Sequence, residues 1–383
     1  MKMLIDVTRL VDRFMQGRLP TGVDRVGLAY VQHYGHNAQA LIRWAGRSWV
    51  LPRAQSDQLF TWLFAPSSAS VVVRIIAGGI LAGWRTQRVA GGFLFNTGHS
   101  GLEQAAYPSM IRKMGVKPLF VVHDLIPITH PEYCRAGEDA RHIVRMNNML
   151  ALASGVIANS QATLDALTQF ARQSNQPMPP AVAALLAPGI VTTVLGKRPL
   201  AAPYFVILST IEPRKNHAML LQVWRRLAEQ LGDSTPRLVV IGQRGWECEN
   251  VVDLLERCIA LKDFVIELPS CSDNELATYL YHAQALLFPS FVEGYGMPLV
   301  EALAMGVPVI ASDLQVFREI ADDIPDYVDA LDGKRWGELV MAYAQPISEH
   351  RAAQLLRMMR FKTPSWAEHF TKVDALMGQL SEG

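Results

Sequence analysis

Two glutamates, Glu293 and Glu301, flank the part of this chain whose residue types are best suited to chemistry. Gly294 and Gly296 lie between them and would let the backbone approach a ligand closely. Pro298 is well placed as the first residue of a helix, and the free amide groups at a helix N-terminus attract anions. A carboxylate in the first turn of that helix can accept hydrogen bonds from both hydroxyls of a ribose. The segment therefore predicts a diphosphate site, with Glu301 on the ribose and Glu293 nearer the reacting group.

The segment 288–313 as a whole resembles the GT4 family of retaining glycosyltransferases, whose signature is two glutamates eight positions apart around such a loop. The resemblance implies that Glu301 holds the donor ribose and that Glu293 contacts the donor sugar as a catalytic residue. It also implies that backbone amides of the loop meet the diphosphate or the sugar. The residues that would supply these amides are Gly294, Tyr295, Gly296 and Met297. The structural alternative, in which Glu301 complements a helix dipole and the glycines only turn the chain, suits a shorter motif better.

A second charged motif, Glu212-Pro-Arg-Lys-Asn216, directly follows another expected strand. Its adjacent cations, Arg214 and Lys215, could reach a diphosphate from the opposite side. The motif is similar to the Gly-Thr-x-Glu-Pro-Arg-Lys-Asn segment of GT4 members, many of them mannosyltransferases, and this implies that Lys215 binds the diphosphate. The commoner family pattern has an arginine where Thr210 stands, so we expect Arg214 to supply the second cation. Two solvated surface cations are the structural alternative.

In the first half of the chain, His123 and Asp124 come at the carboxyl end of an expected strand, where open α/β sheets bind ligands. A histidine there can donate to sugar hydroxyls or assist proton movement. Many GT4 enzymes have an active-site histidine after this strand, which implies a catalytic role for His123, and we expect Asp124 to orient it. A structural role is the alternative for a lone histidine, and His99, His130 and His142 have no stronger claim than that.

Near the start, the segment 18–25 resembles the first glycine loop of the same family. Gly22 would there let the chain pass beside donor and acceptor before a helix begins. An ordinary turn is the alternative. Asn159 and Ser160 also match the family after the fifth expected strand, and Ser160 is interpreted as structural.

Short apolar runs alternate with segments of helical periodicity, which is the pattern of parallel sheets covered by helices. The expected strands are residues 3–7, 40–44, 93–96, 119–123 and 155–158 in the first half and 204–209, 237–241, 264–268, 285–288 and 308–311 in the second. Residues 189–203 are rich in Gly and Pro without helical period, so they are interpreted as a connector between domains.

The fold class that we expect is α/β of the GT-B type, with two Rossmann-like domains whose parallel sheets face an interdomain cleft. The resemblance is strongest over residues 204–313 and fair over 123–160. We expect residues 1–197 to form an acceptor-side domain and residues 198–362 to bind the nucleotide sugar. Pro364 interrupts the helical pattern before a last amphipathic stretch, so residues 363–383 are expected to return to the first domain as a helix.

The charges nearly balance, with 36 Lys and Arg against 35 Asp and Glu and both signs scattered. Nucleic-acid binding is not expected, because it needs clustered cations. The four cysteines have neither the close pairing of a zinc site nor the density of a disulfide scaffold, which favours a reducing cytoplasm. The first residues lack the pattern of a signal peptide, so we expect a cytoplasmic protein.

The longest apolar region, residues 60–84, is broken by Arg74 and by small residues before it reaches the roughly 20 residues that a membrane-spanning helix needs. Its composition suits an interfacial segment in peripheral contact with an anionic inner membrane, and it suits a pair of core helices capped by arginines equally well. The apolar residues concerned are Phe60, Trp62, Leu63, Phe64, Ile75, Ile76, Ile80, Leu81 and Trp84, and the arginines are Arg53, Arg74, Arg85 and Arg88.

The resemblance implies a hexosyltransferase that moves a sugar from a nucleoside-diphosphate sugar to a glycan or lipid-linked glycan in cell-surface polysaccharide assembly. GDP-mannose is favoured as donor, and a UDP-sugar is nearly as well supported. No Asp-x-Asp motif occurs in the chain, so we expect no metal, and no cofactor besides the donor co-substrate. The alternatives are a GT-B sugar phosphorylase or epimerase and a catalytically silent GT-B scaffold subunit, which would lack Glu293, Glu301 or Lys215.

Overall fold

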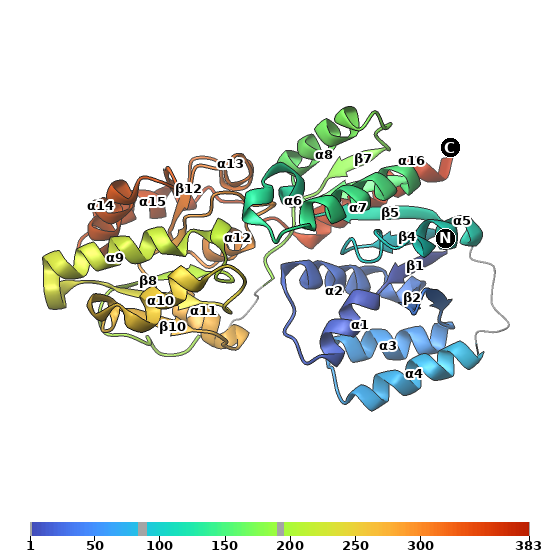
Figure 1. Cartoon of the computed structure of the whole chain (residues 1–383), viewed down its shortest axis with the longest axis horizontal. Coiled ribbons are helices and arrows are strands. Elements are labelled where there is room, and N and C mark those ends of the chain that lie inside the picture. The colour runs from blue at the N-terminus through green and yellow to red at the C-terminus, as the bar shows by residue number, and fades with distance from the viewer. Residues whose placement is uncertain (1, 83–89, 190–194, 383) are drawn as a thin grey trace. The chain divides into compact units, whose positions relative to one another are not determined.

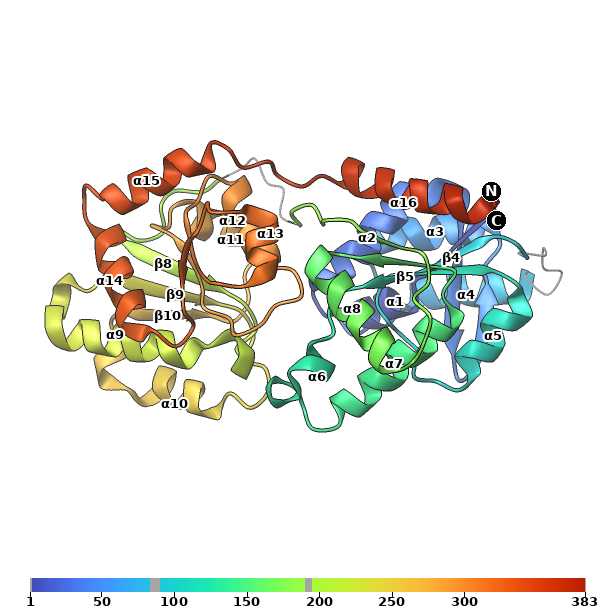
Figure 2. The same ribbon diagram turned by 90° about the horizontal axis from the view of Figure 1, so that it is seen from above.

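The computed structural model describes residues 2–82, 90–189 and 195–382. Its contacts divide the chain into two compact units, the first made of Met1–Leu186 with Trp366–Gly383 and the second of Ala187–Ser365. Each unit is a parallel sheet with helices on its faces (Figures 1 and 2). The chain therefore has the two Rossmann-like domains that were expected from the alternation of apolar runs and helical segments.

The sheet of the first unit has the order β3-β2-β1-β4-β5-β6-β7, and its neighbours are parallel except for the β2–β3 hairpin. Its strands are β1 Met3–Asp6, β2 Ala38–Trp44, β3 Arg47–Val50, β4 Phe93–Asn96, β5 Lys117–Val122, β6 Gly155–Ala158 and β7 Ala181–Ala183. Its helices are α1 Thr8–Met15, α2 Gly22–Tyr34, α3 Arg53–Phe64, α4 Ala69–Ala82, α5 Ala106–Met114, α6 Ile126–Thr129, α7 Glu138–Leu152, α8 Gln161–Gln173 and α16 Trp366–Glu382.

The second sheet is parallel throughout and has the order β10-β9-β8-β11-β12-β13. Its strands are β8 Tyr204–Leu208, β9 Arg237–Ile241, β10 Val265–Leu268, β11 Leu286–Phe288, β12 Val309–Ser312 and β13 Asp326–Val328. Its helices are α9 His217–Leu231, α10 Glu249–Arg257, α11 Asp273–Tyr281, α12 Met297–Ala304, α13 Gln315–Ala321, α14 Gly333–Ala344 and α15 Glu349–Met358.

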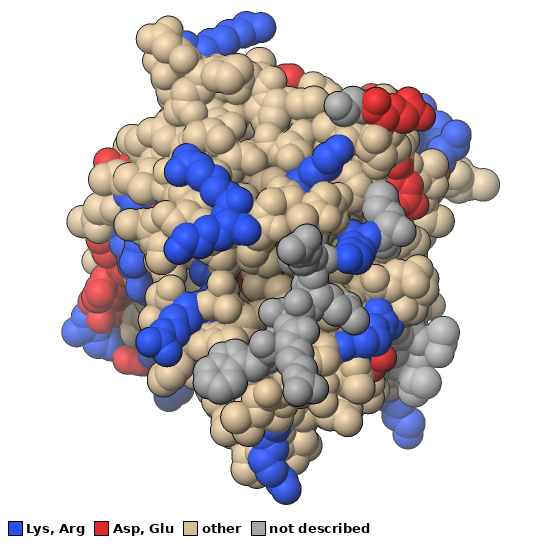
Figure 3. Space-filling model, turned by 90° about the vertical axis from the view of Figure 1, so that its right-hand side faces the viewer, with Lys and Arg blue, Asp and Glu red and all other residues tan. Residues whose placement is uncertain are grey.

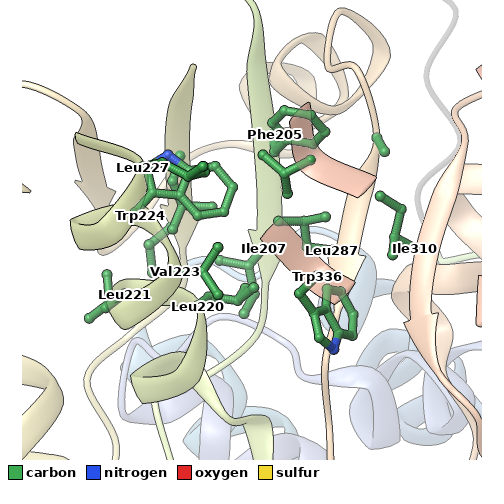
Figure 4. Packing of buried hydrophobic residues seen from close by; sticks show 14 of the residues in the cluster. Phe205, Ile207, Leu220, Leu221, Val223, Trp224, Leu227, Leu287, Ile310 and Trp336 are labelled. Carbon is green, nitrogen blue, oxygen red and sulfur yellow. The ribbon is translucent and has the colours of Figure 1, made fainter. Parts of the chain in front are cut away.

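The core of the second unit forms where α9 and α14 pack on β8 and its neighbours (Figure 4). Trp224 of α9 is fully buried and packs edge-on against Phe205 of β8 at a ring-centroid distance of 5.9 Å. Trp336 of α14 is also fully buried. Each indole N–H donates to a backbone oxygen, of Pro236 at 2.9 Å and of Asp329 at 3.0 Å, so neither large ring leaves a buried donor unpaired.

The central strands are buried on both faces, as in β4, where all of Phe93–Asn96 is buried. Each strand that was predicted from an apolar run is present, with its ends shifted by at most two residues. The sequence prediction missed β3, β7 and β13. These strands have only three or four residues and lie at sheet edges.

The last helix, α16, packs on the first unit beside β6 and β7. The Tyr30 hydroxyl lies 2.9 Å from Nε2 of His369, and the Phe370 ring stacks on His33 at a centroid distance of 3.9 Å. Lys117 donates to the backbone oxygen of Leu380. No helix in the described ranges is long and apolar enough to span a membrane.

Candidate active site

The order of strands in the second sheet brings two charged loops together. Strands β8 and β11 are neighbours, and the chain continues outward to β9 on one side and to β12 on the other. Open α/β sheets bind ligands at the carboxyl ends of strands where the order reverses in this way. The loop after β8 carries Arg214 and Lys215, and the loop after β11 carries Glu293. Two motifs that are distant in sequence therefore meet at one edge.

Glu293 is the centre of a cluster of ion pairs. Its Oε1 contacts the Lys215 ammonium and accepts a hydrogen bond of 2.7 Å from the Ser290 hydroxyl. Its Oε2 accepts from Nη1 of Arg214 at 2.8 Å. The Nε of Arg214 in turn pairs with Oε1 of Glu212 at 2.7 Å. The two cations and two carboxylates cancel each other's charge.

The cluster is nearly closed to solvent, since only 7% of the Glu293 side chain and 10% of the Lys215 side chain are exposed. Burial would by itself raise the pKa of Glu293, but Lys215 and Arg214 outweigh it and lower the pKa to about 2. Burial lowers the pKa of Lys215, and the adjacent Glu293 carboxylate opposes that shift. Glu293 is therefore ionised at neutral pH, and a carboxylate can accept a sugar hydroxyl or stabilise positive charge on a sugar ring.

The loop after Glu293 ends at a glycine that no other residue could replace without strain. Gly296 has φ of +119°, and a Cβ on it would lie 2.7 Å from the Phe317 ring. Phe317 stacks on Phe288 of β11, so the ring has little room to move. Helix α12 begins at Met297, with Pro298 as its second residue and not its first. The helix N-terminus, with its partial positive charge, thus follows directly on the Glu293 loop.

Glu301 lies in the second turn of α12, and the prediction that placed it in the first turn was wrong. The left-handed backbone of Gly296 lets the helix start before Pro298, which moves Glu301 to the fifth helical position. The dipole acts within the first turn, so it accounts less well for a carboxylate at this depth. Glu301 is 4% exposed, and its Oε1 accepts a hydrogen bond of 3.1 Å from the Gly189 amide.

Three residues that hold these loops were missed as site residues. Glu212 and Ser290 orient the ion-paired groups, as described above. Asn216 has φ of +58°, and its side-chain amide donates to the backbone oxygens of Pro289 at 3.2 Å and Ala330 at 2.8 Å. Asn216 belongs to the charged motif and Ser290 lies three residues before Glu293, so proximity in sequence was the available signal.

In the first unit, His123 directly follows β5 and is buried. Its Nε2 lies 2.7 Å from the backbone oxygen of Thr97, and a carbonyl only accepts, so Nε2 carries the proton. Burial lowers the pKa of His123, although the Thr97 bond and the charge of Asp124 act in the opposite direction. The ring is therefore neutral at pH 7, with Nδ1 as an acceptor.

The structure does not support the orienting role expected of Asp124. Its Oδ1 accepts from the amide of Ile126 at 3.1 Å, which closes a local turn before α6, and no hydrogen bond joins it to the His123 ring in the described residues. A short acidic side chain before a helix readily takes this local partner. His99, which was given no particular role, instead packs on His123 at a centroid distance of 5.5 Å and on His142 at 5.7 Å.

Gly22 is the first residue of α2, and the fold itself does not require a glycine there. A Cβ at Gly22 would meet nothing within 4 Å, and its φ is not positive. The turn before it is fixed by other residues, because Asp24 accepts from the amide and hydroxyl of Thr21 at 2.8 and 2.5 Å. The space before this helix is thus open to a ligand.

The predicted site residues are divided between the two units. Arg214, Lys215, Glu293, Glu301 and the loop 294–297 lie together in the second unit. His123, Asp124 and Gly22 lie in the first. Among the described side chains, no group of three or more His, Cys, Asp or Glu is placed to hold a metal ion.

Residues 196–324 match the model of the family described as glycosyl transferases group 1. The serotype-specific mannosyltransferase WbdA of Escherichia coli is 28% identical over 244 residues, which are 59% of this chain and 30% of that protein. The O-antigen chain mannosyltransferase B of Escherichia coli is 36% identical over 152 residues, or 38% of this chain and 39% of that protein. The chain thus spans well under half the length of these curated relatives.

Solved structures share the fold over the whole chain. The Anabaena protein Alr3699/HepE, solved in complex with UDP-glucose, superposes with a TM-score of 0.67 over all of both chains at 15% identity. The sucrose-phosphate synthase of Thermosynechococcus elongatus gives a TM-score of 0.64 over 99% of this chain and 98% of that one, at 14% identity. These likenesses identify the fold as GT-B.

Proposed function

This chain carries a GT4-like glycosyltransferase domain of group 1 with mannosyltransferases among its relatives, and we propose that it is a retaining, metal-independent glycosyltransferase. It transfers a hexose from a nucleoside-diphosphate sugar to a glycan or lipid-linked glycan during assembly of a cell-surface polysaccharide. The observation that carries the proposal is the buried contact of Lys215 and Arg214 with Glu293, beside the N-terminus of α12. It lies inside the segment that matches the family.

The balance of charges around Glu293 indicates how the second unit would bind the nucleotide-sugar donor. The charges of the four ionised groups Glu212, Arg214, Lys215 and Glu293 cancel, so an incoming diphosphate adds negative charge that requires new partners. Lys215 and Arg214 would release part of their contact with Glu293 and bind phosphate oxygens, together with the amides of residues 294–297. Glu293 would then be free to contact the donor sugar. Glu301 would exchange its bond with the Gly189 amide for the ribose hydroxyls.

The first unit would serve the reacting sugar and the acceptor. Neutral His123 offers an acceptor nitrogen to a hydroxyl, and the open space before Gly22 admits a ligand to the N-terminus of α2. Asp124 contributes indirectly, because it holds the turn that follows His123. No residue is assigned as a covalent nucleophile.

The donor favoured is GDP-mannose, because the curated relatives described above are named as mannosyltransferases. A UDP-sugar is the second candidate, since the Anabaena neighbour was solved with UDP-glucose. A thermal-shift series with GDP, UDP, ADP and their sugars decides between them, because a ligand at 100 times its Kd adds about 2.7 kcal/mol to the free energy of unfolding. Stabilisation by GDP-mannose alone supports the proposal, and stabilisation by no nucleotide contradicts it.

Retention is tested on the product. Transfer of mannose from GDP-mannose, an α-linked donor, to a mannose oligosaccharide should give an α-linkage, which NMR of the anomeric proton identifies. A β-linked product would contradict retention and leave the transferase proposal standing.

We further propose that the first unit makes peripheral contact with an anionic membrane surface through α4. This helix packs on the rest of the unit along a narrow strip in which Val72 and Gly79 are buried. Gly79 permits close approach, because a Cβ there would lie 2.8 Å from Leu51. Val73 and Leu81 are 50% and 79% exposed. An apolar helix with so little cover is suited to the interface of a bilayer.

Of the aromatic residues of the preceding helix, Phe60 and Trp62 are buried and take no part in this surface, whereas Phe64 at its end is 51% exposed. Phe60, Trp62 and Leu63 of α3 are buried, so that half of the apolar region is core. Trp84, Arg85 and Arg88 lie outside the described residues. On the face of the first unit that carries α5, Lys and Arg side chains are spread over the middle and Asp and Glu lie mainly toward the margins (Figure 3). Cations there would favour anionic headgroups.

A further inference from the structure

A cavity of about 500 Å³ in the first unit has no role in the site described so far. It lies where β1, β2 and β4 end, and it is lined by Arg43 and Trp44, the last two residues of β2, and by Thr8 and Ser100, which come after β1 and β4. Helices α1 and α5 contribute Asp12 and Tyr107. Strand ends in open α/β sheets are the positions where ligands bind.

One wall of the cavity is formed by Arg43, a buried arginine that several hydrogen bonds hold in place. Arg43 donates from Nε to Asp6 at 2.7 Å and from Nη2 to the backbone oxygen and hydroxyl of Ser100 at 2.7 and 3.0 Å. Its guanidinium lies 5.0 Å from the centre of the Tyr107 ring. Gly101 makes room for it, because a Cβ there would lie 1.7 Å from Nη1. Only 8% of the Arg43 side chain is exposed.

An exposed tryptophan lies at the rim. Trp44 is paired with Arg47 in the β2–β3 hairpin, so Ala45 and Gly46 form a two-residue turn. Both turn residues have positive φ, 49° and 71°, which is the pattern of a type I′ turn. The turn places Trp44, which is 74% exposed, beside the cavity.

Side chains that can form hydrogen bonds with sugar hydroxyls lie around the Trp44 indole. The side chains of Asp12, Arg47 and Gln104 line the cavity, and within the described chain none of them has a hydrogen bond or an ion pair. Burial raises the pKa of Asp12, although Arg43 works against that shift. The charges of Arg43 and Arg47 are balanced by Asp6 and Asp12, so the cavity offers no net positive charge to a phosphate.

We propose that this cavity binds one uncharged pyranose unit of the acceptor glycan, with the indole of Trp44 stacked against the apolar face of the sugar ring. Asp12, Gln104 and Arg47 would bond to its hydroxyls. An aromatic platform with a few polar groups around it matches the amphipathic surface of a sugar better than that of an ion or a lipid chain. The assignment to the acceptor rests on the proposed transferase function, whereas binding of a sugar here does not.

The test measures binding without any donor. Saturation-transfer NMR with an α-linked mannotriose should show contact in the wild-type protein, and Trp44→Ala should weaken the affinity about tenfold, the equivalent of 1.4 kcal/mol. Trp44→Phe keeps an aromatic face and should retain most of the binding. Leu331→Ala, at another exposed apolar side chain, is the matched control and should bind as wild type does. Unchanged melting temperatures would establish that the variants fold.

The outcomes separate this proposal from the proposed function. If the wild-type protein does not bind the trisaccharide, or if Trp44→Ala binds it unchanged, the cavity assignment is overturned even when transfer is active. If Trp44→Ala raises the KM for the acceptor and leaves the KM for the donor unchanged, the assignment to the acceptor is supported. If the trisaccharide binds through Trp44 and no transfer occurs with any donor, the sugar site stands and the transferase function falls.

Discussion

The ammonium of Lys215 lies against the carboxylate of Glu293, although the two residues are 78 positions apart in the sequence. Strand order creates this contact, because β8 and β11 are neighbours in the sheet and their loops end at the same edge. Burial makes each charge dependent on the other, since a lone buried charge is costly.

Substitution of Glu301 and substitution of Glu293 should have different kinetic effects. Glu301→Ala should weaken donor binding about ten- to a hundredfold, because hydrogen bonds to a charged group contribute about 1.5–3 kcal/mol. Glu293→Ala should mainly lower kcat, since that carboxylate would lie beside the reacting sugar. Donor Kd from calorimetry and kcat from initial rates measure the two effects. Wild-type kinetics in both variants would refute the assignment of both residues.

Protein groups alone, without a metal ion, should neutralise the charge of the leaving diphosphate. Activity should therefore survive excess EDTA, and Lys215→Ala should lower turnover by at least about a hundredfold. Neither magnesium nor manganese should rescue this variant. Arg225→Ala, which removes an exposed cation of α9, is the matched control. Loss of wild-type activity in EDTA, with recovery on adding either metal, would show that a metal ion neutralises the diphosphate.

Stability should depend on pH through Glu293. Its pKa is lowered from 4.5 to about 2 on folding, so its contribution is complete above pH 4.5 and is lost as the pH falls toward 2. A shift of that size corresponds to roughly 3 kcal/mol. Urea unfolding of wild type and Glu293→Gln between pH 6 and pH 2.5 measures it. The two proteins should converge in acid, and a constant difference across the range would contradict the lowered pKa.

Gly296→Ala should destabilise the second unit by more than about 2 kcal/mol, since it adds a clash with Phe317 to a positive φ. Gly306→Ala is the control, because Gly306 also has positive φ, of 74°, but a Cβ there would meet nothing within 4 Å. The Gly306→Ala substitution should lower the free energy of unfolding by about 1 kcal/mol, because it introduces backbone strain alone. Equal losses in chemical denaturation would mean that Phe317 moves aside.

Liposome flotation tests the membrane contact of α4. At low salt the protein should float with vesicles rich in phosphatidylglycerol and stay at the bottom with phosphatidylcholine alone. Leu81→Ser should reduce flotation and Leu331→Ser should not, although both leucines are almost equally exposed, at 79% and 78%. Wild-type protein that remains at the bottom with anionic vesicles at low salt would exclude the contact.

The apolar runs predicted the central strands because helices cover both faces of them, which leaves every position buried, as in Phe93–Asn96. The site was less accessible to sequence reasoning. Its residue types were identified, but the pairing of Lys215 with Glu293 depends on strand order, which local sequence does not specify. The turn in which Glu301 lies depends on the backbone angle of Gly296, and the hydrogen bond that Asp124 makes depends on a competition between two nearby partners.

The return of α16 to the first unit has a consequence for synthesis on the ribosome. Phe370, Val373, Leu376 and Met377 are buried in a unit whose other residues all precede Ala187. The second unit, by contrast, is one continuous stretch of chain. The unit that begins earlier in the sequence is therefore the one that completes its fold later, and its apolar surface beside β6 and β7 stays uncovered until α16 leaves the exit tunnel.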